Sequence, residues 1–109
     1  MPYATALLAL SDPMRRTILE RVVAAPRSVG EIARDLPISR PAVSQHLKVL
    51  RDAELVREER VGTRRIYHAE GAALGELRAY IDGMWRAALG SFAEAADEAG
   101  REAHDGDEP

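Results

Sequence analysis

The feature of this sequence that most constrains its fold is a pair of short helices separated by a three-residue turn. Ser28 and Glu31 have the spacing of a capping box, in which the serine caps a backbone N–H and the glutamate reaches back. Residues 36–38 (Leu-Pro-Ile) form the turn, and Ser39 caps a second helix that we expect to end near Ala53. This spacing predicts a helix-turn-helix motif.

Helical patterns precede the motif, and a hairpin and a long helix follow it. An apolar helix is expected over residues 3–10, and a second over residues 13–25, with Asp12 as its N-cap. Residues 55–60 and 65–69 have the pattern of two strands joined by a glycine turn, which would form a wing. Beyond them, apolar residues recur every three or four positions from Gly71 to about Ala99. The predicted fold class is mainly α with one β-hairpin, a winged helix-turn-helix.

The charge of the chain is unevenly distributed along its 109 residues. The net charge is −3, but seven acidic residues and one basic residue lie from Glu94 onward, which leaves 14 basic and 11 acidic residues before that point. Residues 39–65 carry seven bases against four acids, as expected for a surface that binds DNA. We expect one DNA-binding and dimerisation domain over residues 1–99 and an acidic, disordered tail over residues 100–109.

The helix expected after Ser39 has two chemically different faces. At about 100° per residue, one stripe is aliphatic and should face the core: Val43, Leu47 and Leu50. The other stripe consists of hydrogen-bonding and basic side chains: Arg40, Ser44, Lys48 and Arg51, flanked by Gln45. Such a helix fits the major groove of DNA, where its first turns reach the base edges. We assign base reading to Arg40, Ser44 and Gln45, and phosphate contact mainly to Ser39, Lys48 and Arg51.

The wing provides a second basic cluster at the tip of the expected hairpin. Thr63, Arg64 and Arg65 would reach the minor groove or the phosphate backbone there. Residues 57–60 alternate in sign across the two faces of the strand, so some of them should form cross-strand ion pairs of little stability value. DNA contact by Arg57 and Arg60 is left open. The residues predicted to bind DNA are Ser39, Arg40, Pro41, Ser44, Gln45, Lys48, Arg51, Thr63, Arg64 and Arg65.

The last expected helix is long for so small a domain, at roughly 40 Å for about 29 residues. Its apolar stripe needs more cover than one subunit supplies, although Leu74 and Leu77 also fit an ordinary core. We expect a homodimer through the first and last helices, with recognition helices roughly 34 Å apart. The predicted interface is Leu7, Leu8, Leu77, Tyr80, Ile81, Met84, Trp85, Leu89 and Phe92.

Three segments resemble the ArsR/SmtB family of bacterial winged-helix repressors. They are ALSDPMRRTIL at residues 9–19, SVGEIA at residues 28–33 and SRPAVSQHLKVLR at residues 39–51, and the resemblance extends over about residues 4–92. It implies a homodimer that occupies a palindromic operator and leaves it when a signal arrives. Family members usually have glycine where this chain has Glu54; a left-handed backbone there would cost on the order of 1 kcal/mol.

The metal sites that the resemblance suggests are incomplete in this chain. Metal sensors of the family commonly use cysteines at the start of the third helix, where this cysteine-free chain has Ser28 and Gly30. Others use histidine with acidic ligands on the last helix, where Asp82 and Glu94 occur without histidine. His104, among tail acids, would lack a rigid site. We therefore expect no metal and no other cofactor, as in the metal-independent branch of the family, whose members are often autoregulatory.

Other classes of function are less well supported by the sequence. It shows no paired-carboxylate, nucleophile–base or glycine-rich phosphate motif, so we expect no enzyme. A winged helix that binds only protein should have an acidic or apolar recognition face, whereas the outward face described above is basic and hydrogen-bonding. A metal or small-molecule sensor with an unrecognised effector site remains an alternative. The chain has no signal-peptide pattern or membrane-length apolar run, so a cytoplasmic location is expected.

Overall fold

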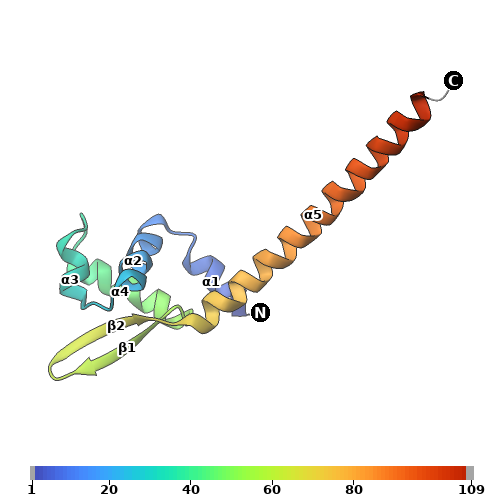
Figure 1. The fold of residues 1–109 in the computed structure, drawn as a ribbon. Helices are drawn as coiled ribbons and strands as arrows, with labels where there is room; N and C mark the ends of the chain where they lie inside the picture. The colour runs from blue at the N-terminus through green and yellow to red at the C-terminus, as the bar shows by residue number, and fades with distance from the viewer. Residues whose placement is uncertain (1, 108–109) are drawn as a thin grey trace. The chain divides into compact units, whose positions relative to one another are not determined.

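The computed structural model describes residues 2–107, apart from the side chains of residue 2 and residues 103–107. Along the chain it contains α1 (Pro2–Ala9), α2 (Pro13–Ala24), α3 (Val29–Arg34), α4 (Arg40–Asp52), β1 (Val56–Val61), β2 (Arg64–Ala69) and α5 (Gly71–Asp107) (Figure 1). This order confirms the predicted winged helix-turn-helix. The chain divides into two compact units, Met1–Leu77 and Arg78–Pro109.

The helix starts are capped by the side chains that the sequence indicated. The Asp12 carboxylate accepts hydrogen bonds from the backbone N–H groups of Met14 at 2.7 Å and Arg15 at 3.2 Å. The bond from the Arg15 N–H is the main cause that lowers the pKa of Asp12. At α3, the Ser28 hydroxyl accepts from the Glu31 N–H at 3.2 Å, and the Glu31 carboxylate accepts from the Ser28 N–H at 3.3 Å. The predicted capping box is therefore confirmed.

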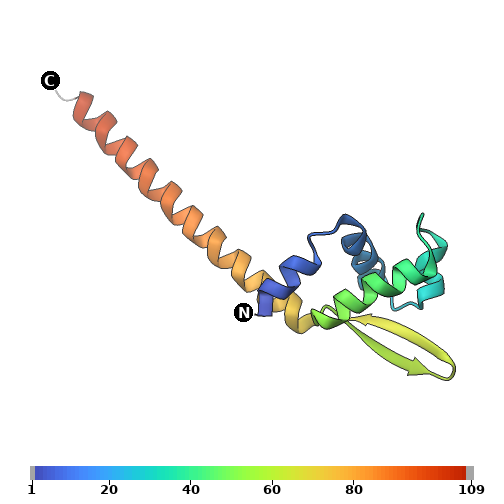
Figure 2. The ribbon, with the colours of Figure 1, turned by 180° about the vertical axis from the view of Figure 1, so that it is seen from behind.

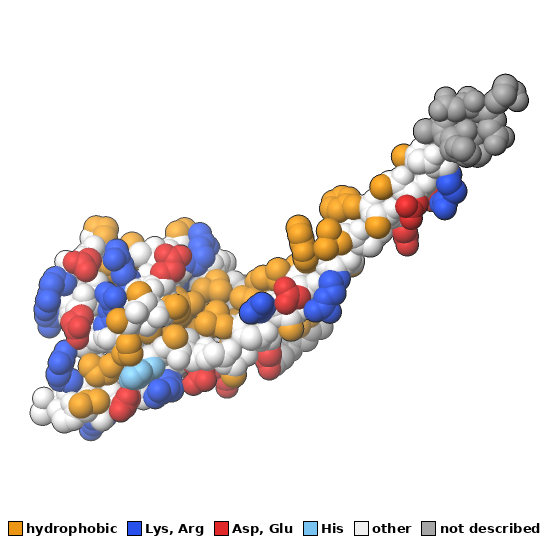
Figure 3. All heavy atoms as spheres, in the orientation of Figure 1, with side chains coloured by type: hydrophobic (Ala, Val, Ile, Leu, Met, Phe, Trp, Pro, Cys, Tyr) orange, Lys and Arg blue, Asp and Glu red, His pale blue; other side chains and the backbone are white. Residues whose placement is uncertain are grey.

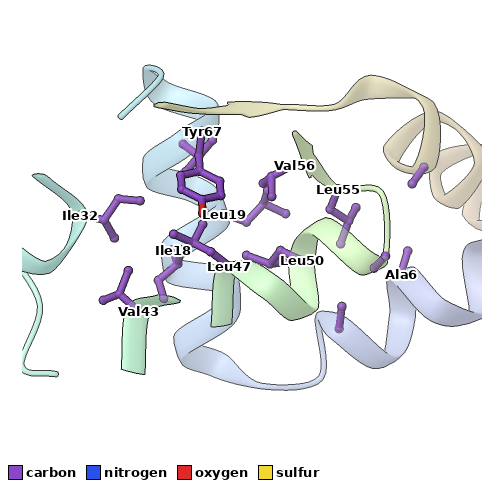
Figure 4. Close-up of a cluster of buried hydrophobic side chains, with 14 residues drawn as sticks. Ala6, Ile18, Leu19, Ile32, Val43, Leu47, Leu50, Leu55, Val56 and Tyr67 are labelled. Carbon is purple, nitrogen blue, oxygen red and sulfur yellow. The ribbon is translucent and has the colours of Figure 1, made fainter. Parts of the chain in front are cut away.

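The core of the first unit lies between α1, α2, α3, α4, the hairpin and the start of α5. The three α4 residues predicted to face inward, Val43, Leu47 and Leu50, are fully buried. Figure 4 shows these side chains meeting Ile18 and Leu19 of α2, with the Tyr67 ring reaching into the same cluster from β2. Burying one face of α4 in this way leaves its opposite face at the surface.

The wing is an antiparallel hairpin in which Glu58 pairs with Tyr67, and Gly62 adopts a φ of 65° in its turn. One further pairing extends it. The Arg27 N–H donates to the Tyr67 carbonyl at 3.2 Å, and the Tyr67 N–H donates to the Arg27 carbonyl at 2.8 Å. This bridge attaches the linker before α3 to β2. The sequence did not predict it, because a single bridging residue produces no alternating pattern.

Helix α4 ends in a Schellman motif. The Leu55 N–H donates to the Leu50 carbonyl at 2.9 Å, and the Glu54 N–H donates to the Arg51 carbonyl at 2.9 Å. Glu54 has a φ of 59°, so the left-handed conformation considered from the sequence is present at this residue. Leu50 and Leu55 are both fully buried, and this hydrophobic contact fixes the direction in which the chain enters the wing.

Helix α5 is longer than predicted. We expected it to end near Ala99 and residues 100–109 to be disordered, but α5 continues to Asp107, and residues 108–109 lie outside the described part. The predicted end of the helix was therefore wrong, and disorder of the tail stays a prediction. A single interior glycine, Gly100, lowers the stability of a helix by only about 1 kcal/mol relative to alanine. Because neighbours such as Arg101 and Glu102 favour helix, the helix continues past it. No helix within residues 2–107 is long and apolar enough to cross a membrane.

Candidate DNA-binding surface

The face of α4 that points away from the core is polar and exposed. Ser39 caps this helix by accepting a hydrogen bond from the Ala42 N–H at 3.3 Å. All the side chains predicted to bind DNA are exposed, both those on α4 and those of the wing. In Figures 1 and 2, α4 and the hairpin belong to the same compact body, and α3 lies close to α4. The surface is thus built by α4, α3 and the hairpin, and packing against the other two holds α4 in place.

A hollow on this surface brings α4 and the wing together. It is lined by Ser44, Gln45, Lys48 and Arg51 of α4, and by Glu58, Arg65 and Tyr67 of the hairpin. Residues assigned separately to base reading, phosphate contact and the wing therefore lie around one concavity. Its basic and hydrogen-bonding side chains can neutralise phosphates and contact base edges.

One carboxylate, that of Glu58, lines this hollow among the basic side chains. Its Oε2 atom accepts from Arg51 Nη1 at 2.9 Å and from the Tyr67 hydroxyl at 3.2 Å, and its Oε1 atom is 3.5 Å from Arg65 Nε. Burial first, and then the Glu58 charge, raise the pKa of Tyr67. The sequence indicated a cross-strand ion pair here, which Arg65 provides. It did not indicate Arg51, because that contact depends on how α4 packs against β1.

A second hollow collects arginines around the start of α3. Arg34, Arg40, Arg64 and Arg65 line it together with Glu31. Arg64 Nη2 lies 2.6 Å from Glu31 Oε1, so the tip of the wing is tied to the capping box of α3. The pKa of Glu31 is lowered, chiefly by the hydrogen bond from the Ser28 hydroxyl and further by the Arg64 charge. Arg34 belongs to this group, although the sequence did not single it out.

Arg40 lies in this second hollow and is not among the residues that line the first. Its Nη2 atom is 3.2 Å from the position that a Cβ atom on Gly30 would occupy. The glycine therefore leaves room for the guanidinium against the backbone of α3. Of the residues predicted to read bases, only Ser44 and Gln45 line the hollow between α4 and the wing.

The hairpin makes two further charged contacts, with partners outside α4. His68 Nε2 is 2.6 Å from Glu59 Oε2, and Arg57 Nε is 4.0 Å from Glu70 Oε2. Among the described residues, no three or more histidine or acidic side chains are grouped so that they could hold a metal ion. The His104 side chain, considered from the sequence, lies outside the described part of the chain.

The side chains predicted to form a dimer interface are exposed in the single chain, with one exception. Leu77 is 8% exposed and thus buried within its own unit. Leu7 and Leu8 are exposed on α1, and along the second unit Figure 3 shows a row of apolar side chains on α5. The exposed members of that row are Tyr80, Ile81, Met84, Trp85, Leu89 and Phe92.

Comparison with known proteins gives consistent matches over most of the chain. Residues 10–59 match the model of a helix-turn-helix domain. The HTH-type transcriptional regulator Rv2034 of Mycobacterium tuberculosis is 51% identical over 92 residues, which are 84% of this chain and 86% of the relative.

Two solved structures have the same fold. An ArsR-like transcriptional regulator from Rhodococcus sp. RHA1 has a TM-score of 0.71 at 33% identity, covering 87% of this chain and 92% of that one. The homodimeric winged helix-turn-helix DNA-binding domain Mb0332 of Mycobacterium bovis has a TM-score of 0.64 at 27% identity, covering 81% of this chain and 82% of that one. With its helix-turn-helix, wing and exposed basic α4 face, this chain belongs to the ArsR/SmtB family of winged helix-turn-helix, DNA-binding transcriptional regulators.

Proposed function

We propose that this protein represses transcription by binding a palindromic operator as a homodimer, and that it acts through binding alone, without catalysis. The observation that carries the proposal is the hollow in which α4 and the wing present hydrogen-bonding and basic side chains together. A helix with such a face fits the major groove, and the wing supplies contacts to the backbone beside it. A protein with this role works where the DNA is, which in a bacterium is the cytoplasm.

Within this surface, the residues have different roles. Ser44 and Gln45 contact base edges, because both side chains donate and accept hydrogen bonds. Lys48, Arg51 and Arg65 contact phosphates, because their positive charges surround the same hollow. Ser39 and Pro41 position the first turn of α4, and Thr63 and Arg64 contact DNA from the tip of the wing. Arg40 contacts DNA from the second hollow, beside α3.

The dimer is supported by the exposed apolar stripe on α5, from Tyr80 to Phe92, and by Leu7 and Leu8 on α1. Exposing many large apolar side chains along one helix is unfavourable in water, and pairing with a second copy removes that surface. The Mycobacterium bovis domain of the same fold is homodimeric. A two-fold dimer places two α4 helices on successive turns of DNA, which is why a palindromic site is expected.

Sequence preference distinguishes the proposed roles. Selection from a random pool of duplexes should enrich a palindrome. Replacing Ser44 and Gln45 together with alanine should reduce the preference for the enriched duplex over a scrambled one by roughly tenfold or more. Arg64→Ala should instead weaken binding to both duplexes and reduce the slope of affinity against salt by about 1. Full discrimination by the double variant would refute base reading by those two residues.

A further inference from the structure

Two of the arginines assigned to phosphate contact already share a carboxylate in the DNA-free protein. Arg51 comes from the last turn of α4 and Arg65 from the start of β2, and both meet Glu58 of β1. The arginine side chains are 46% and 58% exposed, whereas that of Glu58 is 20% exposed. The guanidinium groups are therefore accessible from solvent, while the acidic group lies beneath them.

The position of Glu58 is held by the surrounding structure. Tyr67, whose hydroxyl donates to Oε2, has a largely buried side chain and lies directly opposite Glu58 in the hairpin register. Both carboxylate oxygens are occupied, because Oε2 also receives Arg51 and Oε1 faces Arg65. These three contacts together hold the carboxylate in the hollow.

We propose that Glu58 is a built-in competitor of the DNA phosphates. It holds Arg51 and Arg65 in the free protein and lowers the affinity for every DNA sequence by a similar factor. Only duplexes that also gain base contacts from Ser44 and Gln45 then reach high occupancy. This inference rests on the proposed function, because it requires the hollow between α4 and the wing to face DNA.

The competition follows from the chemistry of the guanidinium group. Carboxylate and phosphate oxygens use the same N–H donors of arginine, so a phosphate that binds Arg51 or Arg65 displaces or shares the bonds to Glu58. If the carboxylate remains in place, its negative charge repels the phosphate at close range, where water is partly excluded. Exposed ion pairs stabilise folded proteins only slightly, so stability alone does not account for this arrangement.

Glu58→Gln tests the proposal, because glutamine preserves shape and an acceptor for Tyr67 while removing the charge. Glu59→Gln is the matched control: it is adjacent, makes the same charge change and lines neither hollow, and its carboxylate meets His68. Affinity is measured by fluorescence anisotropy at several salt concentrations. The probes are a duplex enriched from a random pool and a scrambled duplex of the same composition.

We expect Glu58→Gln to bind both duplexes roughly three- to tenfold more tightly at low salt, with a salt slope steeper by about 1 and an unchanged ratio between the duplexes. Glu59→Gln should change both affinities less than about twofold. If Glu58→Gln binds no more tightly than the control, or more weakly, the proposal is wrong. Glu58→Ala provides a second variant without the carboxylate, and thermal melting verifies that each variant is folded.

Arginine variants separate failure of this inference from failure of the proposed surface. If Arg51→Ala and Arg65→Ala both bind DNA as tightly as the unmodified protein, the hollow does not contact DNA, and the proposed binding surface itself is wrong. If they weaken binding while Glu58→Gln matches its control, the surface stands and only the competition is refuted.

Discussion

The two compact units of this molecule differ in what they do with their apolar residues. In Met1–Leu77, aliphatic side chains from α1, α2, α3, α4, the start of α5 and the hairpin are buried together. In Arg78–Pro109, the described large apolar side chains of α5 are exposed: Trp85 is 61% exposed and Phe92 is 66% exposed. Similar residue types thus stabilise the fold in one unit and remain available for association in the other.

This difference separates two tasks, stabilising the fold and associating with a second copy of the chain. A helix is stabilised in proteins mainly by packing its apolar face, because propensity alone is weak. The first unit provides that packing for α4 within the chain, and so can hold a recognition surface in a fixed geometry. The second unit lacks such cover within its own residues, so we expect its order to depend on a second copy of the chain.

The largest expected effect contrasts the same substitution in the two units. Leu47→Ala removes a fully buried side chain and should lower the free energy of unfolding by about 2–5 kcal/mol. Leu89→Ala, at a side chain 46% exposed, should change it by less than about 1 kcal/mol in protein diluted below the dimer dissociation constant. Urea unfolding measures both. Equal losses for the two variants would contradict the division into a packed and an unpacked unit.

The next effect concerns dimer formation. The chain has a single tryptophan, Trp85, which lies within the exposed stripe, so its emission should shift to longer wavelength when dilution separates the copies. Phe92→Glu should weaken the dimer at least roughly tenfold, because the charge would be buried twice across a two-fold interface. Light scattering gives the mass. Arg86→Glu, about 140° around the helix from the centre of the stripe, is the control and should remain dimeric.

A smaller effect tests the end of α4. Glu54→Gly should raise the free energy of unfolding by about 1 kcal/mol, because Glu54 has a φ of 59°. Glu54→Ala is the matched variant: it removes the same side chain but keeps a Cβ, so it should not gain stability. Thermal melting compares the three proteins. A glycine variant no more stable than the alanine variant would show that the left-handed backbone is not strained.

The smallest effect is a pH dependence in the first unit. The pKa of Glu31 is lower in the folded protein, so the stability it contributes is present above the unfolded value of 4.5 and is lost as the pH falls through the folded value. Glu31→Gln should melt a few degrees lower at neutral pH, and this deficit should shrink as the pH falls below 4.5 and through the lowered pKa of Glu31. Glu20→Gln, exposed on α2, is the control. A deficit independent of pH would assign the effect to capping geometry alone.

Local patterns predicted much of the first unit correctly. The capping box at Ser28, the N-caps of α2 and α4 and the aliphatic stripe of α4 all depend on residues a few positions apart, and the structure confirms them. The errors lie where local signals are weak or distant residues meet. Gly100 did not end α5, and the bridge between Arg27 and Tyr67 joins segments far apart in the chain.

The sequence by itself determined the order of elements, the two faces of α4 and the positive charge of residues 39–65, because periodicity, capping and composition are properties of neighbouring residues. Only the tertiary structure decided which charges meet. Arg51 reaches Glu58 because α4 packs on β1, and Arg64 reaches Glu31 across 33 positions of sequence. Such pairs depend on distances of a few ångströms between separate elements, which the packing of the core fixes.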